Sequence, residues 1–452
     1  MPAIRTWLKN PLAVFTGNNL SAEGGLVIAN GVIEQLLAAG EHPALPCEQV
    51  FDAREHVLLP GLINTHHHFY QTLTRAWGPV VNQPLFPWLQ TLYPVWARLT
   101  PAQLALASKV ALAELLLSGC TTAADHHYLF PNGLEEAIDV QVEAVRELGM
   151  RAMLTRGSMS LGQADGGLPP QQTVQQGEAI LADSQRLIER YHERGDGAQV
   201  QIALAPCSPF SVTPEIMRAS ADMAQRLDVR LHTHLAETLD EEAFCIQRFG
   251  LRTVDYLDSV GWLGPRTWLA HGIHFNPEEI TRLGAAGVGI CHCPTSNMRL
   301  ASGICPTLEL EAAGATVGLG VDGSASNDGS NLMLEARQAL YLQRLRYGAE
   351  RITPELALGW ATRGSAALLG RTDIGELAPG KQADLALLKL DDLRFSGSHD
   401  PVAALLLCGA DRADRVMVGG QWRVIGGQIE GLDVSGLMAD HRQAARVLVN
   451  GT

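Results

Sequence analysis

Short apolar runs alternate with longer amphipathic stretches over most of the chain. The apolar runs end at "LINTHHH" (62–68), "TTAAD" (121–125), "MRAMLTR" (150–156), "VQIALAPC" (200–207), "VRLHTHLAE" (229–237), "TWLAHG" (267–272), "GVGICHCP" (287–294) and "TVGLGVDG" (316–323). Such runs are typical of strands covered on both faces, and helical patterns between them indicate parallel strands joined by helices. Eight such units predict a closed (β/α)₈ barrel of the TIM type; an open doubly wound sheet is the alternative.

The helices between these strands begin with a repeated signal. A Thr or Asn stands before a proline, at Thr100-Pro101, Thr213-Pro214, Asn276-Pro277 and Thr353-Pro354. Ser, Thr, Asn and Asp side chains cap the first turn of a helix, and proline is tolerated at its first position. We therefore expect helices to start at these four prolines.

The two ends of the chain have a different pattern. Stretches such as "GGLVIANGVIEQLL" and "VMVGGQWRVIGGQIEG" alternate apolar and polar residues over short distances and are broken by glycine. This pattern predicts antiparallel hairpins. We expect residues 1–58 and 375–452 to combine into one small β-sandwich domain, beside a barrel formed by residues 59–374.

Composition and charge narrow the classes of partner. Hydrophobic residues make up 46% of the 452 residues, charged residues 18%, and the formal net charge is −14. An acidic chain is a poor ligand for nucleic acid or an anionic membrane, so a small neutral or cationic molecule is expected instead. No apolar stretch has the length of a signal peptide or a membrane span, which predicts a cytoplasmic protein. The eight scattered cysteines indicate neither a disulfide framework nor a zinc knuckle.

Three consecutive histidines follow the first predicted strand. Alternate side chains of a strand share a face, so His66 and His68 should point together into the barrel while His67 points away. Two imidazoles at this spacing can chelate a divalent ion, but the pair alone does not exclude ordinary packed histidines.

Other ionisable residues also fall at predicted strand ends. "HTHLAE" contributes His232, His234 and Glu237, "LAHG" contributes His271, and "GVDG" contributes Asp322. Catalytic residues of (β/α)₈ barrels cluster at the carboxyl ends of the strands. We therefore expect these side chains to converge with His66 and His68 at one end of the barrel.

These motifs resemble those of the aminohydrolases of the amidohydrolase superfamily, a group that includes guanine, cytosine and adenosine-type deaminases. The resemblance covers almost the whole chain, including "GELAPGKQADLALL" near its end. It implies that His66, His68, His234 and Asp322 are metal ligands. It also implies that Glu237 is the general acid/base, that His271 faces the reacting water without binding the metal, and that Asp322 relays a proton to departing ammonia.

The ligand set and the fourth strand bear on the cofactor. A mixed imidazole and carboxylate set suits zinc, with iron as the alternative. Strand four ends in "APCSPF", without a lysine that could bridge two metals after carboxylation. We therefore expect one divalent metal per chain.

The segments "NTHHHFYQTLTRAWGP" and "HCPTSNMRLASGICP" resemble most the deaminases of oxidised guanine, with guanine deaminases and triazine aminohydrolases as alternatives. The resemblance implies a small purine or related heterocycle as substrate and a homo-oligomer, commonly a dimer. Expected substrate-binding residues are Gln71, Trp96, Arg156 and Cys207. Trp96 and Cys207 stand where nucleoside deaminases carry polar sugar contacts, which favours a free base.

Two further hypotheses lie outside this enzyme class. "GLGVDG" (318–323) matches a dinucleotide-binding pattern, but the following "SASNDGSN" does not open a helix. A catalytically dead barrel that serves as a scaffold is the non-enzymatic alternative. The presence of Glu237 together with the full ligand set argues against it.

Overall fold

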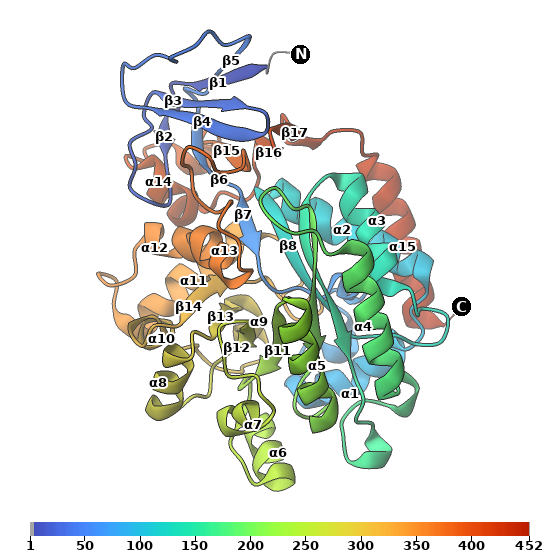
Figure 1. Ribbon diagram of the computed structural model, residues 1–452. Coiled ribbons are helices and arrows are strands. Elements are labelled where there is room, and N and C mark those ends of the chain that lie inside the picture. Colours follow the sequence, from blue (N-terminus) through green and yellow to red (C-terminus); the bar gives the residue numbers. More distant parts are fainter. Residues whose placement is uncertain (1–3, 452) are drawn as a thin grey trace.

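The computed structural model describes residues 4–451 and consists of a parallel barrel with two stacked sheets at one end (Figure 1). The barrel strands are β7 (Leu62–Asn64), β8 (Cys120–His127), β9 (Arg151–Ser158), β10 (Val200–Pro206), β11 (Leu231–Leu235), β12 (Thr267–His271), β13 (Gly289–His292) and β14 (Thr316–Leu319). They lie side by side in chain order, and every adjacent pair is parallel. All eight predicted strands are confirmed, and the doubly wound alternative is wrong.

The first and last strands meet through the residues that follow them. The backbone N–H of Thr65 donates to the carbonyl of Leu319 at 3.0 Å, and the N–H of Val321 donates to Asn64 Oδ1 at 2.9 Å. One residue further on, the N–H of Asp322 donates to the carbonyl of His66 at 3.0 Å. These bonds close the barrel and hold two of the predicted metal ligands next to each other.

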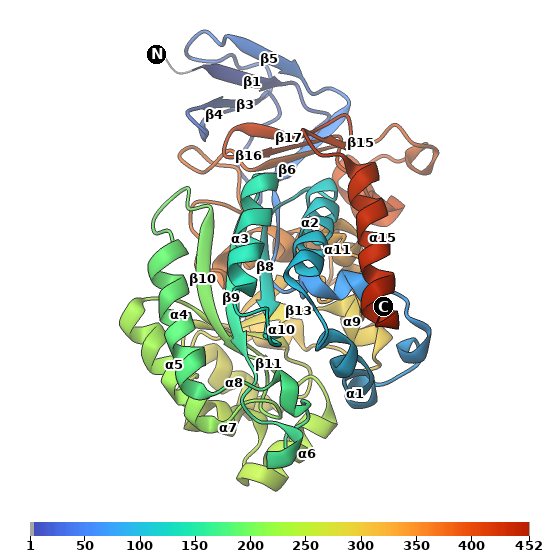
Figure 2. The same ribbon diagram turned by 90° about the vertical axis from the view of Figure 1, so that its right-hand side faces the viewer.

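Helices surround the barrel between the strands (Figures 1 and 2). They are α2 (Pro101–Leu117), α3 (Ala137–Leu148), α4 (Gly177–Tyr191), α5 (Pro214–Leu227), α6 (Leu239–Phe249), α7 (Thr253–Ser259), α8 (Pro277–Ala285), α9 (Pro294–Arg299), α10 (Thr307–Ala312), α11 (Leu332–Tyr347), α12 (Pro354–Gly359) and α13 (Ser365–Leu368). Helices α2, α5, α8 and α12 begin at the four predicted prolines, and both α2 and α8 carry a capping box. The start signal is therefore confirmed at each place.

The two sheets at the end of the barrel are built from both ends of the chain. One sheet contains β1 (Arg5–Lys9), β3 (Gly25–Ala29), β4 (Val32–Leu37) and β5 (Gln49–Asp52). The other contains β2 (Ala13–Val14), β6 (His56–Pro60), β15 (Leu385–Lys389), β16 (Arg415–Val418), β17 (Gln421–Ile425) and β18 (Gln428–Ile429). Leu8 and Leu26 of the first sheet share a buried core with Leu58 and Leu385 of the second. This is the expected composite sandwich (Figure 2).

The last part of the chain departs from the hairpin prediction. Residues Val434–Asn450 form a helix, α15, which lies beside α2 along the barrel (Figure 2). Asp433 caps its first turn by accepting from the N–H of Gly436, and Leu437, Ala444 and Leu448 form its buried stripe. A helical apolar spacing at 437, 444 and 448 therefore sets this segment apart from the alternating residues before it. A short helix, α14 (Pro401–Ala404), also interrupts the expected strands.

One long insertion follows the first barrel strand. It contains two 3₁₀ turns, Phe69–Thr74 and Gly78–Val80, and helix α1 (Leu85–Trp96). Four side chains of α1 line the cavity at the mouth of the barrel, namely Leu85, Trp88, Leu89 and Tyr93. Helix α1 therefore forms one wall of the site.

Candidate active site

Four side chains from the first, fifth and eighth strands converge at the mouth of the barrel. Asp322 Oδ1 lies 3.2 Å from His66 Nε2 and 3.3 Å from His68 Nε2. His68 Nε2 lies 3.2 Å from His234 Nε2. All four residues are buried. The structure thus brings together the four residues that the sequence analysis expected to bind metal.

Hydrogen bonds on the outer side of two of these rings decide where their protons lie. His68 Nδ1 is 2.7 Å from the carbonyl of His126, and His234 Nδ1 is 2.7 Å from the carbonyl of Cys207. A carbonyl only accepts, so each Nδ1 carries the proton and each Nε2 presents a lone pair. Burial holds the pKa of His234 well below its usual range, so this ring is neutral.

Asp322 supplies the negative charge of the cluster. Burial opposes its ionisation, but the nearby imidazoles of His66, His68 and His271 hold its pKa well below the usual range. The second oxygen, Oδ2, accepts from Ser296 Oγ at 2.6 Å and from Ser326 Oγ at 3.3 Å. Oδ1 therefore faces the imidazole nitrogens while Oδ2 is oriented by two hydroxyl groups.

The geometry fits a divalent cation. Bare nitrogen lone pairs and a carboxylate oxygen, 3.2–3.3 Å apart, repel one another unless a positive charge lies between them. Donors about 2.0–2.1 Å from a tetrahedral ion are about 3.3–3.4 Å from each other. His66 Nε2 is buried and has no hydrogen-bond partner, which is the condition expected of a ligand atom. The residues present thus fit a bound divalent metal.

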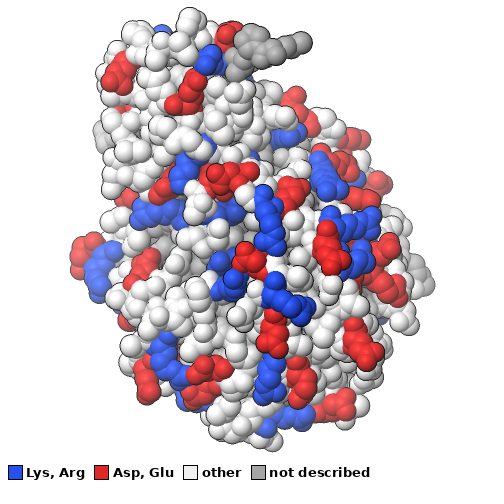
Figure 3. Space-filling model, viewed as in Figure 1, with Lys and Arg blue, Asp and Glu red and all other residues white. Residues whose placement is uncertain are grey.

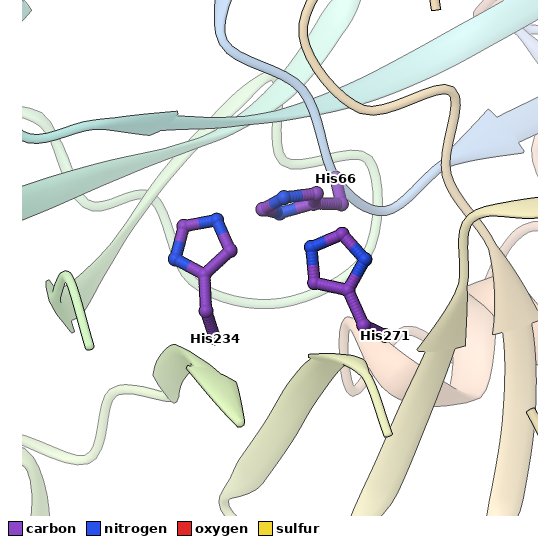
Figure 4. Close-up of side chains that lie close together, drawn as sticks. All are labelled: His66, His234 and His271. Atoms are coloured by element: carbon purple, nitrogen blue, oxygen red, sulfur yellow. The ribbon is translucent and has the colours of Figure 1, made fainter. Parts of the chain in front are cut away.

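Glu237 and His271 lie beside this cluster. His271 Nε2 is 3.5 Å from Glu237 Oε2 and 3.9 Å from Asp322 Oδ2, and its Nδ1 is 2.9 Å from Asn297 Oδ1. Figure 4 shows the rings of His66, His234 and His271 pointing toward one another. Neither Glu237 nor His271 is within hydrogen-bond distance of a ligand nitrogen in the described part of the chain, so both can act on a molecule in the cavity.

The electrostatics of this pair are set by burial and by each other. Burial raises the pKa of Glu237, and Asp322 adds to this effect while His271 opposes it. Burial would lower the pKa of His271, but the nearby charges of Glu237 and Asp322 outweigh it and the pKa is raised. The pair can therefore hold or release a proton near the cluster.

Local backbone geometry aims these side chains across the barrel. His271 and Asp322 have φ angles of 72° and 63°, and Ala236, next to Glu237, has φ 54°. Left-handed conformations in residues other than glycine cost roughly 1–3 kcal/mol and cluster at functional sites. Glu241 holds the turn at Ala236, because its carboxylate accepts from the N–H groups of Ala236 and Glu237 at 2.8 and 3.0 Å.

A cavity opens beside the cluster. Its polar lining includes Gln71, Glu237, His271, Asp322 and Ser326, and its apolar or aromatic lining includes Leu85, Trp88, Leu89, Tyr93, Tyr128, Cys207, Phe210 and Leu300. Cavities of this kind, mostly apolar with a few convergent polar groups, are typical small-molecule sites.

Gln71 and Cys207, two of the expected substrate-binding residues, line this cavity. A Cβ atom at position 323 would lie 1.9 Å from Gln71 Oε1, so Gly323 is needed for the observed position of this side chain. The N–H of Ala325 donates to the same oxygen at 3.3 Å. Cys207 is fully buried, and burial raises the pKa of its thiol to about 12, so it stays a neutral thiol.

The other two expected substrate-binding residues lie elsewhere. The indole of Trp96 donates to Thr74 Oγ1 at 3.2 Å and packs against Tyr70 and Trp88, behind the cavity wall. The guanidinium of Arg156 binds Asp183 at 2.6 Å and Gln175 at 3.0 Å and lies 3.7 Å from the ring of Phe130. Neither lines the cavity, because each is already held by protein partners.

The sequence analysis missed several residues of the site. Trp88, Tyr93, Tyr128 and Phe210 line the cavity, and Asn297 contacts His271. The aromatic run "LFPWLQTLYPVW" (85–96), in the long connection that follows the first strand, was the available signal, because loops at this end of a barrel form the active site. The tyrosine one residue beyond β8, Tyr128, could have been found by the same rule.

The third histidine of the triplet lies as expected from the strand pattern. His67 points away from the cluster, with Nε2 2.8 Å from Ser330 Oγ. Basic and acidic side chains are interspersed on the face shown in Figure 3. Among residues 4–451, no helix combines the length and apolar character needed to cross a membrane.

Comparison with known proteins gives consistent results. Residues 57–423 match the Amidohydrolase family. The chain is 81% identical to an 8-oxoguanine deaminase from Pseudomonas aeruginosa, over 99% of this chain and 100% of that protein. It is 37% identical to a hydroxydechloroatrazine ethylaminohydrolase from Pseudomonas sp. (strain ADP), over 85% of this chain and 81% of that protein.

A solved structure shares the whole architecture. The atrazine chlorohydrolase from Arthrobacter aurescens, complexed with zinc, matches with a TM-score of 0.91 and 33% identity, over 98% of this chain and 100% of that chain. The matches extend through the barrel and the sheets at both chain ends. The chain is therefore a metal-dependent hydrolase that belongs to the amidohydrolase family.

Proposed function

We propose that the protein removes the 2-amino group of 8-oxoguanine by hydrolysis, giving urate and ammonia, with one zinc ion per chain. The observation that carries this proposal is the 81% identity, over the full length, to a protein named for that activity. The cavity supports it, because Gln71 and Cys207 stand at its wall next to Glu237 and His271.

His66, His68, His234 and Asp322 would hold the metal, as their distances and proton positions support. A bound divalent cation supplies Lewis acidity that makes water a nucleophile at neutral pH. One such ion is proposed because β10 (Val200–Pro206) carries no lysine that could bridge two.

The residues beside the ligands have separate proposed roles. Glu237 accepts a proton from the attacking water at its carboxylate and delivers it to a ring nitrogen of the purine. His271, held by Asn297 at 2.9 Å, orients the water and stabilises charge at the attacked carbon. Asp322 Oδ2 relays a proton to the leaving ammonia, with Ser296 and Ser326 orienting that oxygen.

The cavity wall supports a flat free base as the substrate. Trp88, Tyr93, Tyr128 and Phe210 offer aromatic surface, and Gln71 offers an amide that can bond the edge of a purine. The Cys207 thiol and nearby backbone carbonyls are the candidates for contact with the 8-oxo edge. Trp96, which lies behind the wall, has no part in this proposal.

Guanine and hydroxylated triazines are the alternative substrates. The 37% identical relative is named for removing an ethylamine from a triazine, which favours the second. All three reactions release an amine from an amidine carbon of a flat ring, so small differences in one site can favour any of the three substrates.

A homo-oligomer is expected for this family and stays a prediction, which a measurement of molecular size in solution would test.

Product analysis tests the proposed activity. Purified protein with 8-oxoguanine should produce urate, followed by its absorbance, and one equivalent of ammonia. Removal of metal with a chelator should abolish both products, and added zinc should restore them. Turnover that persists after the metal has been removed would contradict the proposal, as would ammonia released without urate.

A further inference from the structure

A buried histidine outside the proposed ligand set contacts one of the ligands. His232, on β11, places Nε2 2.7 Å from Nδ1 of His66. His232 Nδ1 lies 2.9 Å from the carbonyl oxygen of Trp268 on the next strand, β12. Both rings are buried.

The acceptor at the end of this series of hydrogen bonds, the carbonyl of Trp268, fixes the proton positions in both rings. The carbonyl of Trp268 only accepts, so His232 donates from Nδ1, and Nε2 of a ring that carries its single proton there is a lone pair. His66 must then carry its own proton on Nδ1 and donate it to His232 Nε2. His66 Nε2, which has no hydrogen-bond partner, is left with a lone pair directed at Asp322 and His68.

The surroundings hold His232 in this orientation. Its ring stacks on the indole of Trp268, with 4.2 Å between centroids and 12° between planes. The same indole donates from Nε1 to the carbonyl of Thr65 at 3.1 Å, one residue before His66. Trp268 therefore holds His232 through its carbonyl and its ring, and holds the backbone next to His66 through its indole N–H.

We propose that His232 is a positioning residue that fixes His66 in the Nδ1-protonated tautomer and so prepares His66 Nε2 to bind the metal. The proposal rests on the metal site of the proposed function. His68 and His234 have their Nδ1 protons fixed by backbone carbonyls, whereas His66 depends on a side chain. His66 is thus the one of these three histidine ligands whose tautomer a point substitution can release.

Two substitutions separate the hydrogen bond from the bulk of the ring. His232→Leu removes the acceptor and leaves the buried Nδ1–H of His66 without a partner. His232→Gln keeps an acceptor oxygen at about the distance of Nε2. Outer partners of metal-binding histidines typically contribute about 10–100-fold in metal affinity. We therefore expect His232→Leu holoenzyme to lose zinc to a chelator about 10–100-fold more readily than wild type, and His232→Gln to stay within a few-fold of wild type.

His292→Leu is the matched control. His292, on β13, is an equally buried histidine whose Nε2 lies 3.0 Å from Gln343 Nε2 and which makes no hydrogen bond to a proposed ligand. Its replacement should leave zinc retention unchanged. Equal loss of zinc in His232→Leu and His292→Leu would overturn the proposal, as would equal loss in His232→Leu and His232→Gln.

A measurement on the unmodified holoenzyme keeps the proposal testable if His232→Leu does not fold. Two-bond ¹H–¹⁵N correlation spectra report which ring nitrogen carries the proton, and we expect Nδ1 for both His66 and His232. A proton on Nε2 of His232 would overturn the assignment. Because neither readout uses substrate, failure to deaminate 8-oxoguanine would refute the proposed activity alone, whereas wild-type protein that retains no zinc would refute both.

Discussion

Two kinds of side chain face the cavity, and their substitutions have different expected effects. The metal cluster and its hydrogen-bond partners are packed against one another, so most changes there affect metal binding. Glu237 and the aromatic residues of the wall do not contact the ligand nitrogens, and changes there affect the substrate.

Glu237→Gln tests whether Glu237 acts on the substrate without contributing to metal binding. The amide keeps the size of the side chain and can still accept from Ser302 Oγ, which lies 3.3 Å from Glu237 Oε1. It cannot take up a proton near neutral pH, and general acid–base catalysis typically contributes about 10²–10⁴-fold. We expect kcat to fall about 10²-fold or more, with metal content by elemental analysis unchanged. A near-normal rate would make Glu237 a structural carboxylate.

Tyr93→Phe tests a group that sequence reasoning missed. The Tyr93 hydroxyl is buried, has no hydrogen-bond partner among residues 4–451, and belongs to a side chain that lines the cavity. Its removal breaks no bond in the substrate-free protein, so the free energy of unfolding should change by less than about 0.5 kcal/mol. A neutral hydrogen bond to the purine contributes about 1–1.5 kcal/mol, so kcat/KM should fall about tenfold.

Tyr256→Phe is the control for Tyr93→Phe, because the Tyr256 hydroxyl is also buried and unpartnered but does not line the cavity. Steady-state kinetics should show no change for this variant. If Tyr93→Phe and Tyr256→Phe have the same kcat/KM, the Tyr93 hydroxyl does not bind the substrate.

Among single residues, the sequence predicted best the neighbours of those that stand at the ends of barrel strands. His66, His68, His234 and Asp322 could be grouped in advance because a barrel brings the carboxyl ends of its strands together. Trp96 was expected at the cavity and does not line it, whereas Trp88 lines the cavity and was not expected there, and both differences have one cause. Both lie on α1, and the helical pattern does not say which face of a loop helix covers the cavity and which packs behind it.

At the scale of elements, helices on the barrel were easier to predict than the segments that cover it. The Thr-Pro and Asn-Pro starts are local signals, so α2, α5, α8 and α12 could be located from a few residues each. Helix α15 was missed because its neighbours in sequence are strands. Its place against α2 and the turn Phe69–Thr74 depends on tertiary contacts.

The attachment of α15 should depend on pH through His441. Its Nε2 lies 3.0 Å from Thr72 Oγ1, and burial, with a contribution from Arg75, lowers its pKa to about 4. The unfolded chain takes up this proton near pH 6.5, so the unfolded state binds more protons between about pH 6.5 and 4. Stability from this group is complete above that window and is lost as the pH falls through it.

His441→Gln should therefore reduce the acid sensitivity of the protein. The amide can replace the hydrogen bond to Thr72 and does not titrate. Denaturant unfolding at pH 7 and pH 5 should show a smaller loss of stability in the variant than in wild type, by at most about 1.4 kcal/mol per pH unit. Identical losses in the two proteins would show that the partial burial of His441 does not lower its pKa.

At the scale of the whole molecule, the account requires one metal ion per chain. The four proposed ligand atoms lie around one point, and no lysine on β10 could bridge a second ion. Elemental analysis of protein from zinc-supplemented growth should give about one divalent ion per chain. Two tightly bound ions per chain, or none, would contradict this arrangement.

The lining of the cavity also determines which substrates can bind. Aromatic side chains line the cavity, so a sugar attached to the base would place hydroxyl groups against apolar surface. A hydroxyl that loses water and gains no partner costs about 1–3 kcal/mol. Free bases should therefore react better than their nucleosides.

The proposed substrate is tested most directly by kcat/KM values for 8-oxoguanine, guanine, their nucleosides and hydroxylated triazines, measured by ammonia release under one set of conditions. We expect 8-oxoguanine to have the highest value and each nucleoside to fall at least about tenfold below its free base. A higher value for guanine or a hydroxytriazine would contradict the proposed substrate. Nucleosides that react faster than free bases would contradict the account of the cavity itself.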